Sequence, residues 1–326
     1  MNANERMRTG IILGLSAVVA AIAFVFVARD ARRPGPGSAW VYDADRFRET
    51  DPALLLYRET ARFELGFQAA RGIALARDNR LYAVGDATLR LFDADGMPIR
   101  DVALPGEPRC VAVGPQGEAY IGMDGRVAVW TPDGDRISFW PDFGPRARLV
   151  SLVWHDDEVF VADAGNRTVA RHAPDGTFRA TLARPAGLDE HGESVGLIVP
   201  SPHLDIAMAP DGLLRVVNPG RQRIEAVTMD GKTEWMWGRA SFGIEGFSGC
   251  CNPTDIAILA NGDIVTAEKG LPRVKVHRSL TGELVGVVAG PEAFDEKTAG
   301  MDLAVDSQDR IFVLDPMRGH VRIYER

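Results

Sequence analysis

Three aspartates occupy the same place in three successive segments of the sequence. Asp205, Asp255 and Asp302 each stand immediately before a short apolar run, and His203 lies two residues before the first of them. Carboxylates are preferred ligands of hard cations such as Ca²⁺ and Mg²⁺, so the three side chains would form a cation site if the fold brought them together. The alternative role is structural, because aspartate commonly caps a local turn with its side chain. The many ligands that a calcium site requires favour the structural role, and the cation site is the second interpretation.

The three cysteines are another source of chemistry. Cys250 and Cys251 are adjacent within a Gly-Cys-Cys-Asn-Pro segment, whereas Cys110 stands alone. In an oxidising compartment the pair could form a vicinal disulfide, and as thiolates it could bind a soft metal. The favoured interpretation is a rigid structural loop. Cys110 is expected to be a small buried apolar residue.

Other motifs that carry chemistry are missing from the sequence. It contains no nucleophile elbow, phosphate-binding glycine loop, haem-attachment motif or zinc-binding spacing. Its 45 acidic residues against 37 Lys and Arg make it a poor match for nucleic acid. We therefore predict no catalytic residue, no cofactor and no nucleic-acid partner.

Repeated apolar runs identify the elements that would position these residues. Each repeat has an apolar run, a turn, a second apolar run, a polar turn and a third run, with a period of about 40–50 residues. The first runs begin at Ile73, Val111, Leu152, Ile206, Ile256 and Leu303. Turns such as Pro210-Asp-Gly and Ala260-Asn-Gly join the first run to the second, as in β-hairpins. Four short strands per repeat predict an all-β fold, a six-bladed β-propeller.

Two of these repeats carry a recognisable motif. Val161-Ala-Asp-Ala-Gly-Asn-Arg-Thr-Val and Val216-Val-Asn-Pro-Gly-Arg-Gln-Arg-Ile, each followed by Asp-Gly, resemble the core of an NHL repeat. Residues 313–323 are a looser match, and residues 242–257 resemble the connector into a following NHL blade with a cysteine pair added. The resemblance covers about residues 55–326 and implies an NHL-type propeller. It implies little about activity, because propellers host many functions. The Glu and Asn ligands of calcium-dependent lactonase propellers have no matching set in this sequence.

The last repeat has only three strands before the sequence ends. Residues 55–65 precede the first repeat, and we expect them to supply the missing fourth strand by pairing with residues 318–326, which removes an open sheet edge. In such a ring the residue before each first run lies near the mouth of the central channel. This places the three aspartates close together, whereas Cys110 and the cysteine pair belong to opposite blades, too far apart for a disulfide.

The N-terminal region predicts a membrane anchor. Residues 9–28 carry no charge, and about 20 residues at ~1.5 Å rise span the ~30 Å core of a bilayer. We expect residues 1–8 to be a short cytoplasmic tail, residues 9–28 a transmembrane helix, residues 29–54 a linker and lead-in, and residues 55–326 the propeller. Basic residues flank both ends of the run, so charge does not decide its orientation. The very short tail favours a propeller exported to the periplasm. A cleaved signal peptide is the alternative, which the length of the run disfavours.

Small residues on this helix suggest a helix-packing face. Gly10 and Gly14 form a Gly-x-x-x-Gly step that Ala17 and Ala21 roughly continue. The alternative is that these residues have no packing role, because small residues are common in membrane helices. Two long insertions, residues 185–201 and 239–253, are the places where a propeller partner would bind. We therefore expect a non-enzymatic scaffold, possible partners being exported proteins or the subunits of a respiratory or photosynthetic inner-membrane complex. The alternative is an enzyme, redox or metal-binding propeller that uses the three aspartates or the cysteine pair.

Overall fold

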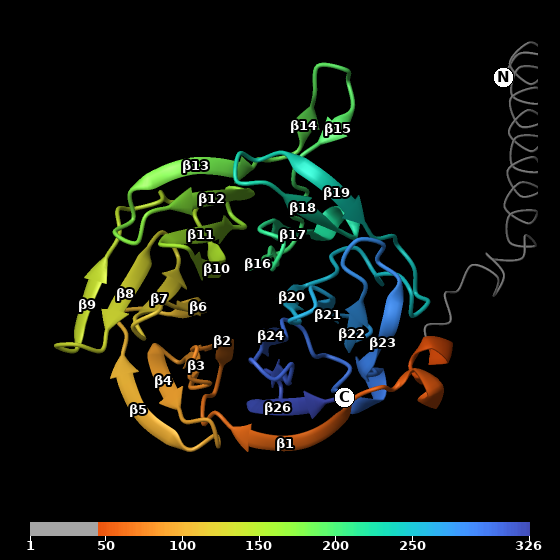
Figure 1. Cartoon of the computed structure of the whole chain (residues 1–326), viewed down its shortest axis with the longest axis horizontal. Coiled ribbons are helices and arrows are strands. Elements are labelled where there is room, and N and C mark those ends of the chain that lie inside the picture. The colour runs from red at the N-terminus through yellow and green to blue at the C-terminus, as the bar shows by residue number, and fades with distance from the viewer. Residues whose placement is uncertain (1–44) are drawn as a thin grey trace, which may run out of the picture. The chain divides into compact units, whose positions relative to one another are not determined.

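The structure, a computed structural model, describes residues 45–326. This part of the chain forms six four-stranded antiparallel sheets arranged as blades around a common centre (Figure 1). Blades 1 and 2 comprise β2 (Ala70–Leu75), β3 (Leu81–Gly85), β4 (Thr88–Phe92), β5 (Pro98–Ala103), β6 (Pro108–Val113), β7 (Ala119–Met123), β8 (Val127–Thr131) and β9 (Arg136–Phe139). Blades 3 and 4 comprise β10 (Leu149–His155), β11 (Glu158–Asp163), β12 (Thr168–His172), β13 (Phe178–Ala183), β16 (Ile206–Met208), β17 (Leu214–Asn218), β18 (Arg223–Val227) and β19 (Thr233–Trp237). Blades 5 and 6 comprise β20 (Asp255–Ile258), β21 (Ile264–Glu268), β22 (Arg273–His277), β23 (Leu284–Ala289), β24 (Asp302–Val305), β25 (Ile311–Asp315), β26 (His320–Glu325) and β1 (Arg58–Glu64).

The ring closes by pairing the two ends of the propeller. β1 is the outer strand of blade 6 and runs antiparallel to β26, with Arg58 opposite Glu325 and Glu64 opposite His320. The pairing expected between residues 55–65 and 318–326 is therefore present. The closing strand starts at Arg58, later than expected, because residues 55–56 contact blade 5, where the Leu56 amide donates to the Val287 carbonyl (3.2 Å).

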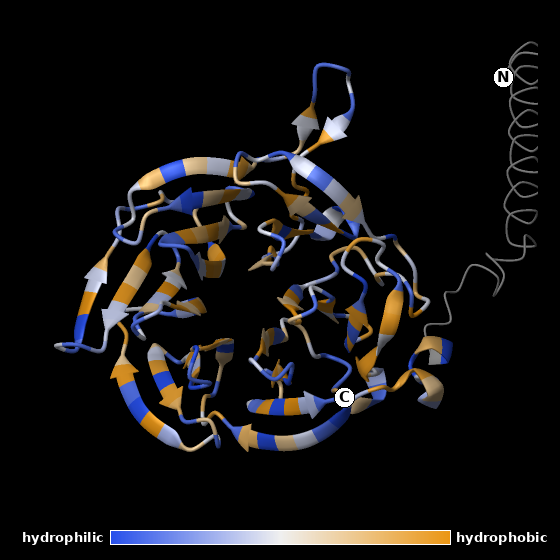
Figure 2. Ribbon diagram, viewed as in Figure 1, coloured by the Kyte–Doolittle hydropathy of each residue, from blue (hydrophilic) through white to orange (hydrophobic). Residues whose placement is uncertain are grey.

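Burial decreases from the inner strands to the outer strand in most blades. The second strands are buried along all or nearly all of their length, as in β3 and β21, whereas outer strands such as β5 and β9 are mostly exposed. The outer strand of blade 5, β23, is the exception and is mostly buried. Ribbon hydropathy follows the same trend, with apolar inner strands and alternating outer strands (Figure 2). Each hydrophobic cluster in residues 45–326 joins two neighbouring blades, so burial of apolar side chains holds the ring together blade by blade.

Some segments of residues 45–326 lie outside the regular blade pattern. The first insertion forms a hairpin of β14 (Gly187–Leu188) and β15 (Ser194–Val195), which projects from the ring between blades 3 and 4 (Figure 1). The lead-in is compact at its end, with short 3-10 turns η2 (Asp45–Phe47) and η3 (Pro52–Leu54).

The helical segments of residues 45–326 are all short 3-10 turns, and none is long and apolar enough to cross a membrane. The transmembrane helix expected at residues 9–28, with its Gly10, Gly14, Ala17 and Ala21 stripe, lies outside the described residues.

Candidate functional site

The three aspartates at the channel mouth bind the neighbouring blade. Each carboxylate accepts a hydrogen bond from the first-strand amide of the next blade around the ring, rather than capping a turn within its own blade. Asp205 Oδ2 accepts from the Ile256 amide (2.7 Å), Asp255 Oδ1 from the Leu303 amide (2.9 Å) and Asp302 Oδ2 from the Ile73 amide (2.6 Å). The expectation that these aspartates cap local turns is therefore wrong, because their hydrogen-bond partners lie in the neighbouring blade. The side chains join consecutive blades through contacts 48–229 residues apart.

The other blades use different residues at the same position. Ser151 Oγ accepts from the Ile206 amide (3.3 Å), which continues the pattern from blade 3 to blade 4. In blade 2 the Cys110 thiol donates to the Leu149 carbonyl (3.6 Å). Gly72 has no side chain, and a Cβ there would lie 3.2 Å from Cys110 Cα, so close backbone approach joins blades 1 and 2. The channel-mouth position of each blade is therefore occupied by a small residue or by a short side chain that forms a hydrogen bond.

The three carboxyl groups also influence one another. Burial raises the pKa of Asp205 to about 7, with the Asp302 charge adding to the effect. Burial and the charges of Asp205 and Asp302 raise the pKa of Asp255 well above its ordinary value, and burial raises that of Asp302 to about 6. Like charges that are buried close together disfavour ionisation. This cluster retains protons near neutral pH.

The geometry does not favour the cation site considered for these aspartates. No group of three or more His, Cys, Asp or Glu side chains in residues 45–326 is arranged to hold a metal ion. The three aspartates line both a channel cavity of about 650 Å³ and a smaller cavity of about 250 Å³, which His203 also lines. Burial lowers the pKa of His203 to about 4, with the Lys269 charge adding to the effect, so this imidazole is neutral at pH 7.

The Cys250–Cys251 pair is the other candidate site. Cys250 is exposed, Cys251 is buried, and their sulfur atoms lie 3.2 Å apart as free thiols. The hydrogen bond that Cys250 shares with Cys251 raises the pKa of Cys250, which opposes formation of a thiolate nucleophile. Cys110 lines the channel from blade 2 and is a buried thiol, as expected. The oxidation state of the pair stays a prediction.

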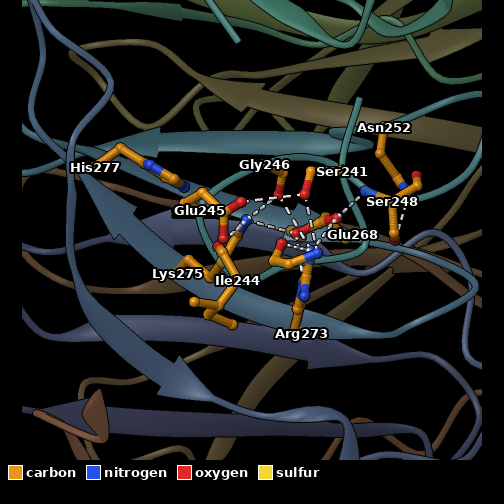
Figure 3. Close-up of polar contacts among 12 residues, drawn as sticks. Ser241, Ile244, Glu245, Gly246, Ser248, Asn252, Glu268, Arg273, Lys275 and His277 are labelled. Atoms are coloured by element: carbon orange, nitrogen blue, oxygen red, sulfur yellow. Dashed lines mark hydrogen bonds and ion pairs between the residues drawn. The ribbon is translucent and has the colours of Figure 1, made fainter. Parts of the chain in front are cut away.

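The segment that carries the cysteines, residues 239–253, is held by buried charges of blade 5 (Figure 3). Glu268 forms ion pairs with Arg273 (2.7 Å) and Lys275 (2.8 Å), and all three side chains are at most 1% exposed. Both cations also donate to main-chain carbonyls of the segment: Lys275 to Gly246 (2.7 Å) and Arg273 to Phe242 (3.1 Å). The Ser248 amide donates to Glu268 Oε2 (2.7 Å). We call residues 239–253 the cysteine loop, and this network fixes its backbone.

The charges in this network support one another. Burial by itself raises the pKa of Glu268, but the charges of Lys275 and Arg273 lower it by more. The pKa of Glu268 is therefore below its ordinary value. Burial lowers the pKa of Lys275 to about 8, against the opposing effect of Glu268. Glu268 is therefore ionised at neutral pH, and the network is a satisfied buried ion cluster.

The hairpin insertion is held by the neighbouring turn of blade 4. The Asn218 side chain, fully buried, accepts from the Ile198 amide (3.0 Å) and donates to the Gly196 carbonyl (3.0 Å). Arg221 donates to Ser194 Oγ (2.8 Å). The next residue of the same turn, Gln222, donates to the Gly249 carbonyl of the cysteine loop (2.8 Å). The turn between β17 and β18, which contains η4 (Pro219–Arg221), therefore connects both insertions.

The residues that hold the two insertions were not predicted from the sequence. Arg273, Lys275 and His277 alternate with valines along β22, and alternation normally indicates a half-exposed strand. In the structure, all five residues of β22 are buried. One signal was available in the sequence. The repeat pattern places this strand in the middle of a blade, where charged residues are unusual.

The fold is similar to that of known proteins, although the sequence is not. The sequence matches no family model and no curated protein. Among solved structures, virginiamycin B lyase from Staphylococcus aureus is 12% identical, with a TM-score of 0.58 over 83% of this chain and 99% of that chain. The WD40 β-propeller domain of Doa1 is 16% identical, with a TM-score of 0.57 over 83% of this chain and 97% of that chain. A protein of unknown function from Bacteroides thetaiotaomicron is 16% identical, with a TM-score of 0.56 over 81% of this chain and 72% of that chain. Likeness at these identities shows the fold alone: residues 45–326 form a six-bladed β-propeller.

Proposed function

We propose that this protein is a membrane-anchored, NHL-type propeller that acts without catalysis as a docking scaffold. One observation carries the proposal: two long insertions, the hairpin and the cysteine loop, are tied to the same turn of blade 4 by Arg221 and Gln222. Loops fixed in advance lose little conformational freedom on binding, which favours recognition of a partner. The three channel aspartates are occupied in joining blades, which leaves them poorly placed for catalysis.

The chemistry of the hairpin suits a protein surface. Leu188 is 75% exposed and Val195 44% exposed, although both are apolar. The turn between them is acidic, with Asp189, Glu190 and Glu193. Exposed apolar side chains beside charge are typical of interaction sites. A partner with an apolar patch bordered by basic residues would complement this hairpin.

The path of the lead-in relates this surface to the proposed anchor. Phe47 packs against Phe242 of the cysteine loop, with ring centroids 5.9 Å apart, and Arg48 pairs with Glu296 (3.1 Å). About 16 residues separate the apolar run at 9–28 from Asp45, and at ~3.3 Å per residue they reach at most ~53 Å. If the run spans the inner membrane, the cysteine loop is therefore within reach of its periplasmic surface. We propose an accessory subunit of an inner-membrane complex, with a respiratory or photosynthetic complex as the candidate assembly.

Co-purification from membranes tests the scaffold. The full-length protein would be extracted in mild detergent, as the wild type and as the double variant Leu188→Asp, Val195→Asp. We expect the double variant to retain less than about a tenth of the bound partner, because hot-spot contacts are often worth more than ~1.4 kcal/mol. The matched control is Leu280→Asp, which changes a leucine 68% exposed in the turn between β22 and β23. A wild-type protein that migrates as a lone monomer would refute the proposal.

A further inference from the structure

The third strands of blades 3 and 5 each end in a histidine that packs against a tryptophan and a phenylalanine from the preceding part of the chain. In blade 5, His277 lies 5.1 Å from Trp237 and 5.7 Å from Phe247, measured between ring centroids. In blade 3, His172 lies 5.6 Å from Trp140 and 5.3 Å from Phe143. The interplanar angles also agree, at 36° and 35° for the tryptophans and at 51° and 53° for the phenylalanines. The two blades therefore offer the same aromatic frame.

In blade 5 one ring of this frame packs against a cation of the protein itself. Lys275 Nζ lies 4.9 Å from the centroid of the Phe247 ring and 2.8 Å from Glu268 Oε1. The strand register makes the comparison with blade 3 direct: Glu268 stands opposite Arg273 as Asp163 stands opposite Thr168. Counting along the third strand, Ala170 corresponds to Lys275 and His172 to His277. Blade 3 keeps the acid and the rings but has no cation at either position.

The missing side chains leave a cavity in blade 3. It has a volume of about 380 Å³, and its lining includes Asp163, Thr168, Ala170, His172, Phe143 and Phe178. Phe178 is 59% exposed, and its ring contacts His172 at 5.6 Å. In blade 5, the side chains of Arg273 and Lys275 are buried at the corresponding strand positions. The cavity is accordingly long enough for an extended alkyl chain with a charged end.

Two polar groups of this cavity lack the partners found in blade 5. Asp163 is only 4% exposed, and it has no ion pair within residues 45–326. Its Oδ1 accepts main-chain hydrogen bonds from Arg148, Gly165 and Asn166. Among the residues that the structure describes, Oδ2 accepts only from Asn166 Nδ2 (2.6 Å). His172, 5% exposed, has a buried Nδ1 without a hydrogen-bond partner in the described residues. Burial lowers the pKa of His172 to about 4, so the imidazole is neutral at pH 7 and does not repel a cation.

We propose that this cavity binds an alkylammonium group, with the ammonium near Asp163 and the alkyl chain against Phe143 and Phe178. Carboxylate and aromatic faces are the two surfaces that attract such a cation most strongly when water is excluded. A lysine side chain of a partner protein and a free amine share this chemistry. The inference does not depend on the scaffold function, because a small amine would bind whether or not a complex exists.

Titration with small amines tests the site. The probes are n-butylammonium chloride and Nα-acetyl-lysine amide, with Nα-acetyl-norleucine amide as the uncharged isostere, and the readout is NMR of His172 and the phenylalanine rings in the full chain. We expect both amines to bind and the isostere to bind at least tenfold more weakly. Tighter binding of the lysine amide than of butylammonium would indicate a peptide source, and the reverse a free amine. Equal shifts with amine and isostere would overturn the proposal.

Variants separate binding from folding. Asp163→Asn keeps the Oδ1 acceptor and should weaken amine binding at least tenfold, whereas Asp157→Asn removes an exposed charge at a left-handed position that Asn tolerates, and should leave binding unchanged. Ala170→Lys should fill the cavity with the protein's own cation, abolish amine binding and raise the melting temperature above that of Ala170→Met. This advantage of Lys over Met should vanish when Asp163→Asn is also present. A Lys variant less stable than the Met variant would contradict the inference.

Discussion

Two sets of buried carboxylates in this propeller behave in opposite ways. Glu268 in blade 5 is fully buried between Arg273 and Lys275, and its pKa is lowered. Asp205 and Asp255 at the channel mouth are 8% and 7% exposed, have amides and one another as neighbours, and their pKa values are raised. Burial is similar, so the partner decides the charge state.

The difference explains what each set does. An ionised Glu268 holds two cations, and these bind the carbonyls of the cysteine loop, which fixes a surface loop from inside the blade. The channel aspartates need only accept one amide each, and this joins blade to blade even when a carboxyl is protonated. The first set serves the proposed docking surface and the second serves the ring.

The largest effect is expected at Glu268. Glu268→Gln leaves Arg273 and Lys275 buried without a counter-charge, and breaking a buried pair in this way costs about 3–5 kcal/mol. Urea unfolding of the full chain measures the loss. Glu283→Gln, an exposed glutamate of the same blade, is the control and should stay within ~0.5 kcal/mol of the wild type. A loss below ~1 kcal/mol for Glu268→Gln would contradict the account of Glu268 as the ionised partner of Arg273 and Lys275.

A smaller loss is expected in the channel. Asp255→Ala leaves the Leu303 amide without its acceptor, which costs about 1–3 kcal/mol. Asp255→Asn retains an acceptor oxygen and should recover most of that loss. Thermal unfolding distinguishes the two variants. If Asn is as damaging as Ala, the hydrogen bond between blades is not what this position provides.

The raised pKa of Asp205 predicts a pH dependence of defined sign. Its folded-state pKa of about 7 lies above the ordinary 3.8, so the folded state binds more protons between these values. The associated stability is full below pH ~4 and is lost as pH rises towards ~7. Asp205→Asn cannot titrate, so its stability relative to the wild type should increase from pH 5 to pH 8, on the order of 1–3 kcal/mol. Histidine contributions cancel in this difference. Urea midpoints at the two pH values measure it, and no change or a decrease would contradict the raised pKa.

The smallest effect is expected where the two insertions meet. Gln222→Ala removes one exposed hydrogen bond to Gly249 and should cost only about 0.5–1.5 kcal/mol or less. We expect faster hydrogen exchange of residues 248–251, with unchanged exchange in β21 and β22. Uniformly faster exchange throughout blade 5 would instead indicate general destabilisation.

The sequence allowed the repeat, the turn residues and the closing strand to be predicted, because all depend on local apolar alternation and on one missing strand. It also singled out the channel aspartates. Their partners could not be predicted, since the Ile256 amide that Asp205 binds is 51 residues away and the propensity of aspartate for turns indicates a local cap. Arg273 and Lys275 were missed because a solvated face and a buried ion cluster produce the same alternation. Only the loop packed on that face distinguishes them.

Hydrogen exchange on the membrane-extracted protein tests the scaffold most directly. The full chain would be compared in mild detergent with its partners bound and in a harsher detergent that strips them. The account predicts that binding slows exchange in residues 185–201 and 239–253 together, with little change in blades 1 and 2. Protection confined to other blades, or no difference between the two preparations, would contradict the proposal that these two insertions form the docking surface.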